Sequence, residues 1–275
     1  MRISPFTPVY FSMNDIDYNA IQNGTHIFST TDHILLETFH LLNEPMPALL
    51  LINAETGVEI STLTWNSIGI NATERLSFYE LRDLLPGYYK IMFGDFISNL
   101  IYVTDNNAEL DNTVRIQYAM KDNKCRRDFM SWINGRCVYA DFRIHGGFLD
   151  SDWSFYVENE QFVTASQDIV ELYALDYTEK VLTIGLSAGT SAWNGEMVNR
   201  ILSCDYVFID GIRYSRSGNS TPVIKDSDIN GTRFVYTQNL REAHFLNAES
   251  ERANRLYLRR TPSKFRRTNN HLRKL

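Results

Sequence analysis

The chain has 275 residues, which exceeds the length of one typical domain and predicts two domains joined by a short linker. Hydrophobic residues make up 44% of it and aromatic residues 13%, a balance that favours half-buried β-sheets over a helical bundle. No window holds the roughly 18 consecutive apolar residues of a membrane-spanning helix, and the start lacks the features of a secretory signal, so we expect synthesis in a cytoplasm and no membrane partner.

Positive charge gathers at the end of the chain. Of the 27 Lys and Arg residues, nine follow Glu251, whereas none of the 33 Asp and Glu residues does, so 18 basic groups face 33 acidic ones in the first 251 residues. The nine are Arg252, Arg255, Arg259, Arg260, Lys264, Arg266, Arg267, Arg273 and Lys274. Such asymmetry indicates an interacting segment, and we call residues 239–275 the basic C-terminal arm.

In chain order, residues 1–107 read as a first domain of short strands separated by turns. The segments rich in β-branched, aromatic and aliphatic residues are Thr25–Ser29, Ala48–Ile52, Gly57–Leu63, Leu76–Leu81, Tyr88–Phe93 and Leu100–Thr104. Pro86-Gly87 predicts a tight turn just before one of these strands, as in immunoglobulin-like sandwiches. We therefore expect a β-sandwich that ends near the polar stretch Thr104–Ala108.

Residues 108–238 read as a second β-rich domain with one helix. Expected strands are Thr113–Tyr118, Val138–Ile144, Phe155–Val157, Val170–Tyr173, Lys180–Gly185, Tyr206–Ile209, Ile212–Ser215 and Arg233–Thr237. Ser191 is a suitable N-cap, and the apolar spacing over Ala192–Ser203 predicts a helix. Asp210-Gly211 between two apolar runs predicts a two-residue hairpin turn. The fold class is therefore mainly β, with two sandwich-like domains, one short helix in the second, and the basic C-terminal arm.

Cysteine and histidine give no signal for a metal or cofactor. Cys125, Cys137 and Cys204 are widely spaced and contain no CxxC pair, so we expect buried reduced thiols. The histidines at positions 26, 33 and 40 recur every seventh residue, but in an extended chain that odd spacing alternates their faces. We expect no metal site and no cofactor.

A serine hydrolase is the main enzymatic alternative. Gly185-Leu186-Ser187-Ala188-Gly189 matches GxSxG between a strand and a helix, and Asp205 or Asp210 with His244 would complete the order Ser, Asp, His. The expected helix begins several residues after Ser187, however, and the chain lacks the repeated strand-helix units of a parallel sheet. We therefore interpret this glycine-rich segment as a turn and predict no catalytic residues.

Two binding alternatives concern nucleic acid and sugar. The basic C-terminal arm could neutralise phosphates, but it lacks interleaved aromatic residues and the rest of the chain is acidic, so we expect it to contact the acidic surface of a neighbouring copy. A carbohydrate-binding adhesin module would use exposed aromatic rings. Its candidates are Trp65, Trp132, Trp153 and Trp193.

Several segments resemble structural proteins of tailed bacteriophages and prophages of Bacteroidetes, of the crAss-like or a related group. In the first domain they are Pro86-Gly87-Tyr88-Tyr89, Phe96-Ile97-Ser98-Asn99 and Val103-Thr104-Asp105. In the second they are Asp168–Leu172, Leu182–Gly185, Asn199–Leu202, Ile209–Gly211 and Tyr214–Gly218. Together these segments span roughly residues 85–222, whereas the first 40 residues and the basic end have no counterpart in the resemblance.

The resemblance implies a virion component of the tail or its baseplate, with β-sandwich modules arranged in a ring. It brings no catalytic residues, and its implied partners are copies of the same chain and other tail proteins. In that setting sandwich domains act as rigid blocks, and side-by-side contacts between copies close the ring by rotational symmetry.

Overall fold

The computed structural model describes residues 1–13, 24–186, 189–227 and 232–243, except for the side chains of residues 150–152. Over this part the chain is mainly β and forms several sheets, as the sequence predicts. It has a ten-residue helix, α3 (Ala192–Ile201), and a single helical turn, α2 (Asn107–Leu110). Neither of these two helices is long and apolar enough to cross a membrane.

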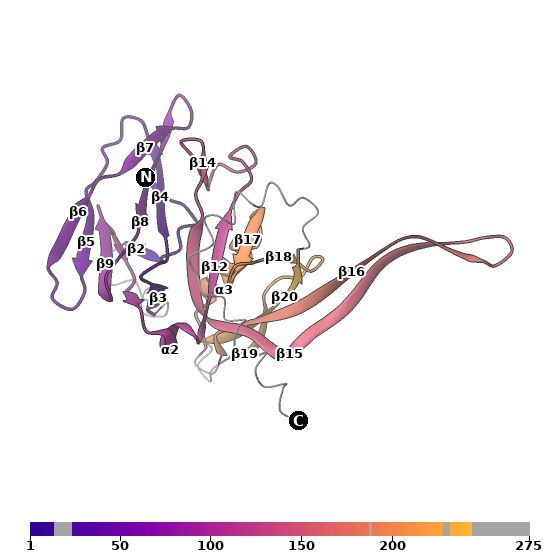
Figure 1. Ribbon diagram of the computed structural model, residues 1–275. Helices are drawn as coiled ribbons and strands as arrows, with labels where there is room; N and C mark the ends of the chain where they lie inside the picture. The colour runs from indigo at the N-terminus through magenta and orange to yellow at the C-terminus, as the bar shows by residue number, and fades with distance from the viewer. Residues whose placement is uncertain (14–23, 187–188, 228–231, 244–275) are drawn as a thin grey trace.

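The first region, up to Thr104, contains two sheets that enclose a core (Figure 1). One sheet has the order β1 (Arg2–Ile3), β4 (Ile34–Leu41), β8 (Glu74–Leu81) and β7 (Asn66–Gly69). The other has the order β2 (Phe11–Met13), β10 (Phe96–Ser98), β9 (Gly87–Phe93), β11 (Ile101–Thr104) and β3 (His26–Ser29), and β9 also pairs with β5 (Leu49–Asn53), which pairs with β6 (Glu59–Leu63). The pairing of β11 with β3 is parallel and all the others are antiparallel.

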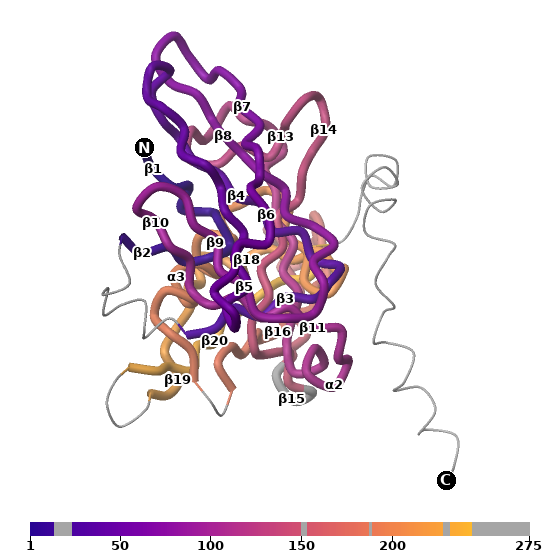
Figure 2. The backbone as a smooth tube through the Cα atoms, turned by 90° about the vertical axis from the view of Figure 1, so that its left-hand side faces the viewer, coloured from indigo at the N-terminus to yellow at the C-terminus, as the bar shows by residue number. Residues whose placement is uncertain are grey.

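The second region closes on itself as a six-stranded antiparallel barrel. Around the ring the strands are β12 (Thr113–Ala119), β15 (Ala140–Val163), β16 (Ile169–Ile184), β20 (Phe234–Glu242), β18 (Ile212–Arg216) and β17 (Tyr206–Ile209), which pairs with β12 again. Strand β19 (Val223–Ser227) pairs with β20, and β13 (Trp132–Ile133) with β14 (Arg136–Cys137) forms a small hairpin. Closure pairs strands that an open sheet would leave at its edges. Figure 2 looks onto the first region, whose strands lie in front of the barrel.

The local signals of the second region form the structures that the sequence predicts. The Ser191 side chain accepts a hydrogen bond from the Asn194 backbone N–H at 3.4 Å, so it caps α3. Asp210 and Gly211 have φ of 47° and 85°, the left-handed values that a two-residue hairpin turn requires. Gly195 lies against the barrel, because a Cβ there would come within 2.7 Å of the Tyr236 ring.

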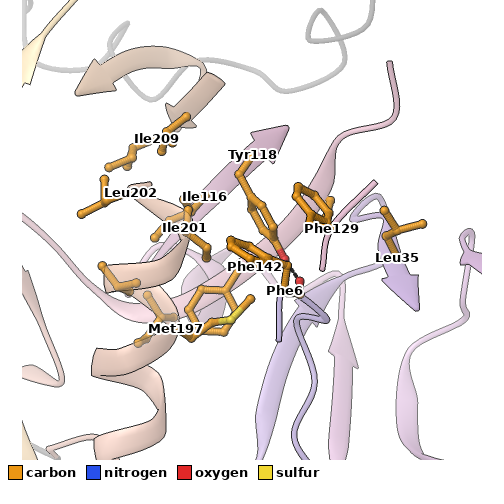
Figure 3. Packing of buried hydrophobic residues seen from close by; sticks show 14 of the residues in the cluster. Phe6, Leu35, Ile116, Tyr118, Phe129, Phe142, Met197, Ile201, Leu202 and Ile209 are labelled. Atoms are coloured by element: carbon orange, nitrogen blue, oxygen red, sulfur yellow. Dashed lines mark hydrogen bonds between the residues drawn. The ribbon is translucent and has the colours of Figure 1, made fainter. Parts of the chain in front are cut away.

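Both regions contribute to one hydrophobic core (Figure 3). Phe6 and Leu35 of the first region lie in the same cluster as Tyr118 and Phe142 of the barrel and Met197 of α3. The Phe6 and Phe129 rings stack at 4.9 Å, and the Tyr118 hydroxyl donates to the Phe6 carbonyl. A second cluster fills the space between the two sheets of the first region. The shared cluster makes the two regions pack as neighbours through buried apolar side chains.

A buried ion cluster also joins the regions. Asp32, between β3 and β4, accepts two hydrogen bonds from Arg143 of β15, at 2.7 and 2.9 Å. Arg115 of β12 has Nε 3.2 Å from Asp32 Oδ1 and donates to Asp141 at 2.5 Å. The Asp141 carboxylate in turn accepts the backbone N–H of His33 at 2.7 Å. The charges of two carboxylates and two guanidinium groups therefore balance each other in a buried site.

The boundary between the two regions lies where the chain passes from one set of sheets to the next. Strands up to Thr104 pair only with one another, and so do the strands from Thr113 onward, within the described residues. Strand β20 continues to Glu242, so the barrel includes the first four residues of the basic C-terminal arm, residues 239–242. The rest of the arm that the structure describes is residue 243.

Candidate interaction surface

Strands β15 and β16 are much longer than the barrel needs, and together they project from it as a hairpin (Figure 1). The last pair between β15 and β12 is His145 with Thr113, and the last pair between β16 and β20 is Glu179 with Arg241. From Trp153 to Thr178 the two strands pair only with each other among the described residues. We call residues 153–178 the projecting hairpin.

The base of the projecting hairpin is fixed by a close backbone approach and a change of register. A Cβ at Gly146 would lie 2.4 Å from the Thr183 carbonyl oxygen, so a glycine is required where β15 leaves the barrel. Between the pair Phe148–Leu182 and the pair Trp153–Lys180 the register shifts. Irregularities of this kind bend a strand and increase its twist, which accounts for the departure of the hairpin from the barrel wall.

The tip is a compact polar turn. The Thr164 backbone N–H donates to the Asp168 carbonyl at 2.9 Å, and the Asp168 N–H donates to the Thr164 hydroxyl at 3.0 Å. Gln167 adopts φ of 67°, and Ser166 donates to the Asp168 carboxylate at 3.1 Å. These bonds satisfy the backbone at the turn, so the tip is defined by its own sequence.

Large apolar side chains cover the projecting hairpin and remain in contact with water. Of the 22 large hydrophobic residues that are exposed in the described part, eleven lie on it. They are Trp153, Phe155, Tyr156, Val157, Phe162, Val163, Ile169, Val170, Leu172, Tyr173 and Leu175. Phe155 is 74% exposed and Ile169 66%. Exposed apolar side chains are normally scattered singly over a protein surface, so this concentration makes the projecting hairpin a candidate interaction surface.

One face of the projecting hairpin combines aromatic rings with carboxylates. Alternation along β15 places Tyr156, Glu158 and Glu160 on the same face, opposite Tyr177, Leu175 and Tyr173 of β16. The Tyr156 and Tyr177 rings stack at 5.4 Å. We call this the tyrosine-glutamate face; Arg241 of β20 lies at its inner end.

The residues of the hydrolase alternative are only partly described. Ser187 and His244 lie outside the described residues. The Asp205 carboxylate accepts the backbone N–H of Lys121 at 3.0 Å. Gly185, at the start of the GxSxG segment, directly follows strand β16 of the antiparallel barrel, and a Cβ there would lie 2.5 Å from the Phe234 carbonyl oxygen. The local geometry thus requires glycine for packing at this position.

Nor does the structure describe the nine Lys and Arg residues that follow Glu251, which all lie beyond residue 243. Sequence reasoning found two fragments of the projecting hairpin as strands but missed the hairpin as an interaction surface. The signal for it was present, because β-prone runs flank the polar segment Thr164–Asp168 on both sides and contain no Lys or Arg from Trp153 to Glu179.

Histidines and cysteines of the described part lie at separate places. His26 packs edge-on against Trp193 at 5.0 Å, and burial lowers the pKa of its imidazole to about 4. His40 hydrogen-bonds Ser77 at 2.7 Å. All three cysteines are free, Cys125 is exposed, and Cys137 and Cys204 are half-buried, which corrects the expectation of buried thiols. Cys125 sits in the polar loop before β13, where no apolar neighbour covers it in the clusters described.

The four tryptophans also occupy different surroundings. Trp193 packs against Phe142, and Trp65 packs edge-on against Phe93 at 5.4 Å. Trp132 is 39% exposed on β13 and donates its indole N–H to the Met120 carbonyl. Trp153 is 50% exposed at the base of the projecting hairpin. The two exposed rings therefore belong to different elements of the barrel region.

Comparison of the chain with protein-family models, with curated proteins and with solved structures found no match.

Proposed function

We propose that this chain is a structural protein of a phage virion that assembles with copies of itself and with other tail proteins into a tail or baseplate ring. The observation that supports contact as its function is the projecting hairpin, with eleven exposed apolar side chains on two strands. The resemblance over residues 85–222 supports the setting of a virion.

A two-stranded ribbon is only marginally stable in water without a third strand or a packed face. Burying one large side chain such as Phe155 contributes about 1.5–3 kcal/mol. Several of the eleven buried together would offset the entropy lost on association. Among the described residues, no third strand pairs with the outer edges of this ribbon. Their backbone N–H and C=O groups are therefore available to a strand of a partner.

The setting is tested by proteomics of purified phage particles from the host that carries this gene. We expect peptides of this chain in stoichiometric amounts with the tail proteins. Particles that contain their tail proteins but lack this chain would contradict the proposal.

Self-assembly is tested by light scattering on the full chain and on a variant with a shortened hairpin. In the variant Asn-Gly replaces Tyr156–Tyr177, so that a two-residue turn joins the paired residues Phe155 and Thr178. We expect a multi-subunit mass for the full chain and a monomer for the variant. A matched control is Leu85→Asp, which alters a residue 75% exposed in the first region and should leave the mass unchanged.

The hydrolase alternative has its own discriminating experiment. A fluorophosphonate probe labels an activated serine. We expect the wild-type chain and Ser187→Ala to show the same background labelling. Labelling that disappears in Ser187→Ala would favour the hydrolase and count against a purely structural function.

A further inference from the structure

The projecting hairpin is acidic as well as apolar. Between Trp153 and Thr178 the sequence contains five carboxylates and no Lys or Arg. They are Glu158, Glu160, Asp168, Glu171 and Asp176. A partner that covers the hairpin must therefore supply positive charge, because carboxylates that lose water without a cation are costly.

One arginine of this chain already shows how the tyrosine-glutamate face binds a guanidinium group. Arg241 donates to the Glu158 carboxylate at 3.1 Å, and its guanidinium carbon lies 3.8 Å from the centre of the Tyr177 ring. The same ring is stacked on Tyr156. A carboxylate and an aromatic ring thus hold one planar cation together, by an ion pair and a cation–π contact.

The same pair of groups recurs farther toward the tip. Glu160 and Tyr173 face each other across the ladder on the tyrosine-glutamate face, four residues beyond Tyr156 and Tyr177. At about 3.3 Å per residue this second pair lies roughly 13 Å farther out. Within the described part of the chain no Lys or Arg is paired with Glu160. The second site therefore has a carboxylate and a ring directly opposite each other, whereas in the first site Glu158 and Tyr177 occupy diagonal positions, and no arginine of the described part occupies the second site.

The sequence offers a matching segment. Residues 252–275 contain nine basic residues, seven of them Arg, and no acidic residue. The other 251 residues are acidic overall, with 33 acidic against 18 basic groups. Several guanidinium groups spaced along one segment are the chemistry that a ladder of carboxylates and tyrosine rings recognises.

We propose that residues 252–275 of a second copy bind the tyrosine-glutamate face of the projecting hairpin, with an arginine between Glu160 and Tyr173. The proposal rests on the proposed function for the presence of a second copy. Assembly through the apolar side chains of the hairpin can stand without it.

The first test is the binding of a fluorescent synthetic peptide of residues 252–275 to two proteins in which Gln replaces every arginine after Glu251, which we call the arm-neutralised background. One of them has the intact hairpin and the other has the shortened hairpin. We expect anisotropy to report saturable binding to a protein with an intact hairpin, weakening as salt rises, and none to the shortened hairpin. Equal binding to both proteins would overturn the proposal.

Point variants in the same arm-neutralised background locate the site. Glu158→Gln with Glu160→Gln should weaken binding about fivefold or more, because the charge-assisted contact to Glu160 is lost and the neighbouring Glu158 carboxylate no longer attracts the basic segment. The control, Glu55→Gln with Asp95→Asn, removes two exposed carboxylates from the first region and should leave affinity unchanged. Equal losses in the two double variants would mean non-specific attraction to an acidic protein and would overturn the proposal.

Substitution of Tyr173 separates the ring from general packing. Tyr173→Leu should weaken peptide binding about threefold, whereas Tyr173→Phe keeps the π face and should retain it. Equal effects of the two variants would remove the ring from the proposal.

Mixing distinguishes a neighbouring copy from the chain's own arm. A full-length protein with Glu158→Gln and Glu160→Gln supplies an intact arm, and the arm-neutralised protein supplies an intact face. We expect association when the two are mixed, above that of either alone. If the mixture does not associate although the peptide binds, the arm occupies the hairpin of its own chain and the second-copy proposal fails. If the variants assemble normally while the shortened hairpin does not, the proposed function stands without this inference.

Discussion

Substitution of Asp32 should destabilise the whole protein, because this carboxylate has no exposed surface and compensates two arginines. Its side chain is 0% exposed, and those of Arg143 and Arg115 are 7% and 11% exposed. Asp32→Asn keeps the shape but removes the charge that accepts two hydrogen bonds from Arg143 and one from the Ser29 backbone. Removing one member of a buried ion pair costs about 3–5 kcal/mol, since the remaining charge stays buried. For a chain of this size that corresponds to a fall in Tm of about 6–20 °C.

Differential scanning calorimetry measures the fall, and an exposed ion pair provides the control. Glu196 and Arg200 pair at 2.8 Å on one turn of α3, with side chains 63% and 35% exposed, so Glu196→Gln should cost no more than about 0.5 kcal/mol. The double variant Asp32→Asn with Arg143→Met should be less destabilised than the sum of the single variants, by about 1–3 kcal/mol. If Asp32→Asn lowers Tm no more than Glu196→Gln, the cluster does not hold the two regions as we argue.

Three further outcomes follow from burial and charge. Burial raises the pKa of Glu37 well above its ordinary value, so the folded chain keeps a proton that the unfolded chain loses, and stability should fall as pH rises above that ordinary value. Tm recorded from pH 4 to 8 should show this fall for the wild-type chain, and Glu37→Gln should abolish it. Maleimide at pH 7.5 should modify the exposed Cys125 first, because burial raises the thiol pKa of Cys137 to about 11 and of Cys204 to about 12. Mass spectrometry of timed samples measures the order, and equal rates for all three thiols would contradict the prediction. A chain ending at Glu251 should assemble less at low salt and respond less to added salt in light scattering, while its circular dichroism stays unchanged; an identical salt response would refute the part assigned to the basic C-terminal arm.

Where one face of a strand is buried and the other half-exposed, the sequence alone predicts the strand. In β9 the residues Tyr89, Ile91 and Phe93 are buried and alternate with half-buried neighbours, and the run of aromatic and aliphatic residues after Pro86-Gly87 marks the strand in the sequence. The turn at Asp210-Gly211 and the cap at Ser191 were predictable for a similar reason, because each depends on a few adjacent residues.

Strand β4 shows why other elements escaped prediction. Seven of its eight residues are buried, and they include Glu37 and His40. Leu36 packs into the core of the first region, whereas Leu35 packs into the core shared with the barrel. With both faces covered there is no alternation to read, and a buried glutamate resembles a solvent-facing one in the sequence.

By itself the sequence determined the mainly β character, the helix over 192–201 and the concentration of positive charge after residue 251, since these follow from composition and short-range spacing. Only the tertiary structure decided that β-prone residues of β15 and β16 leave the barrel, and that Asp32 meets Arg143, 111 residues away. Local spacing fixes which face of a strand is apolar. What covers that face depends on segments distant in the chain. On the projecting hairpin, no described strand pairs with or covers the part beyond the contact of Arg241.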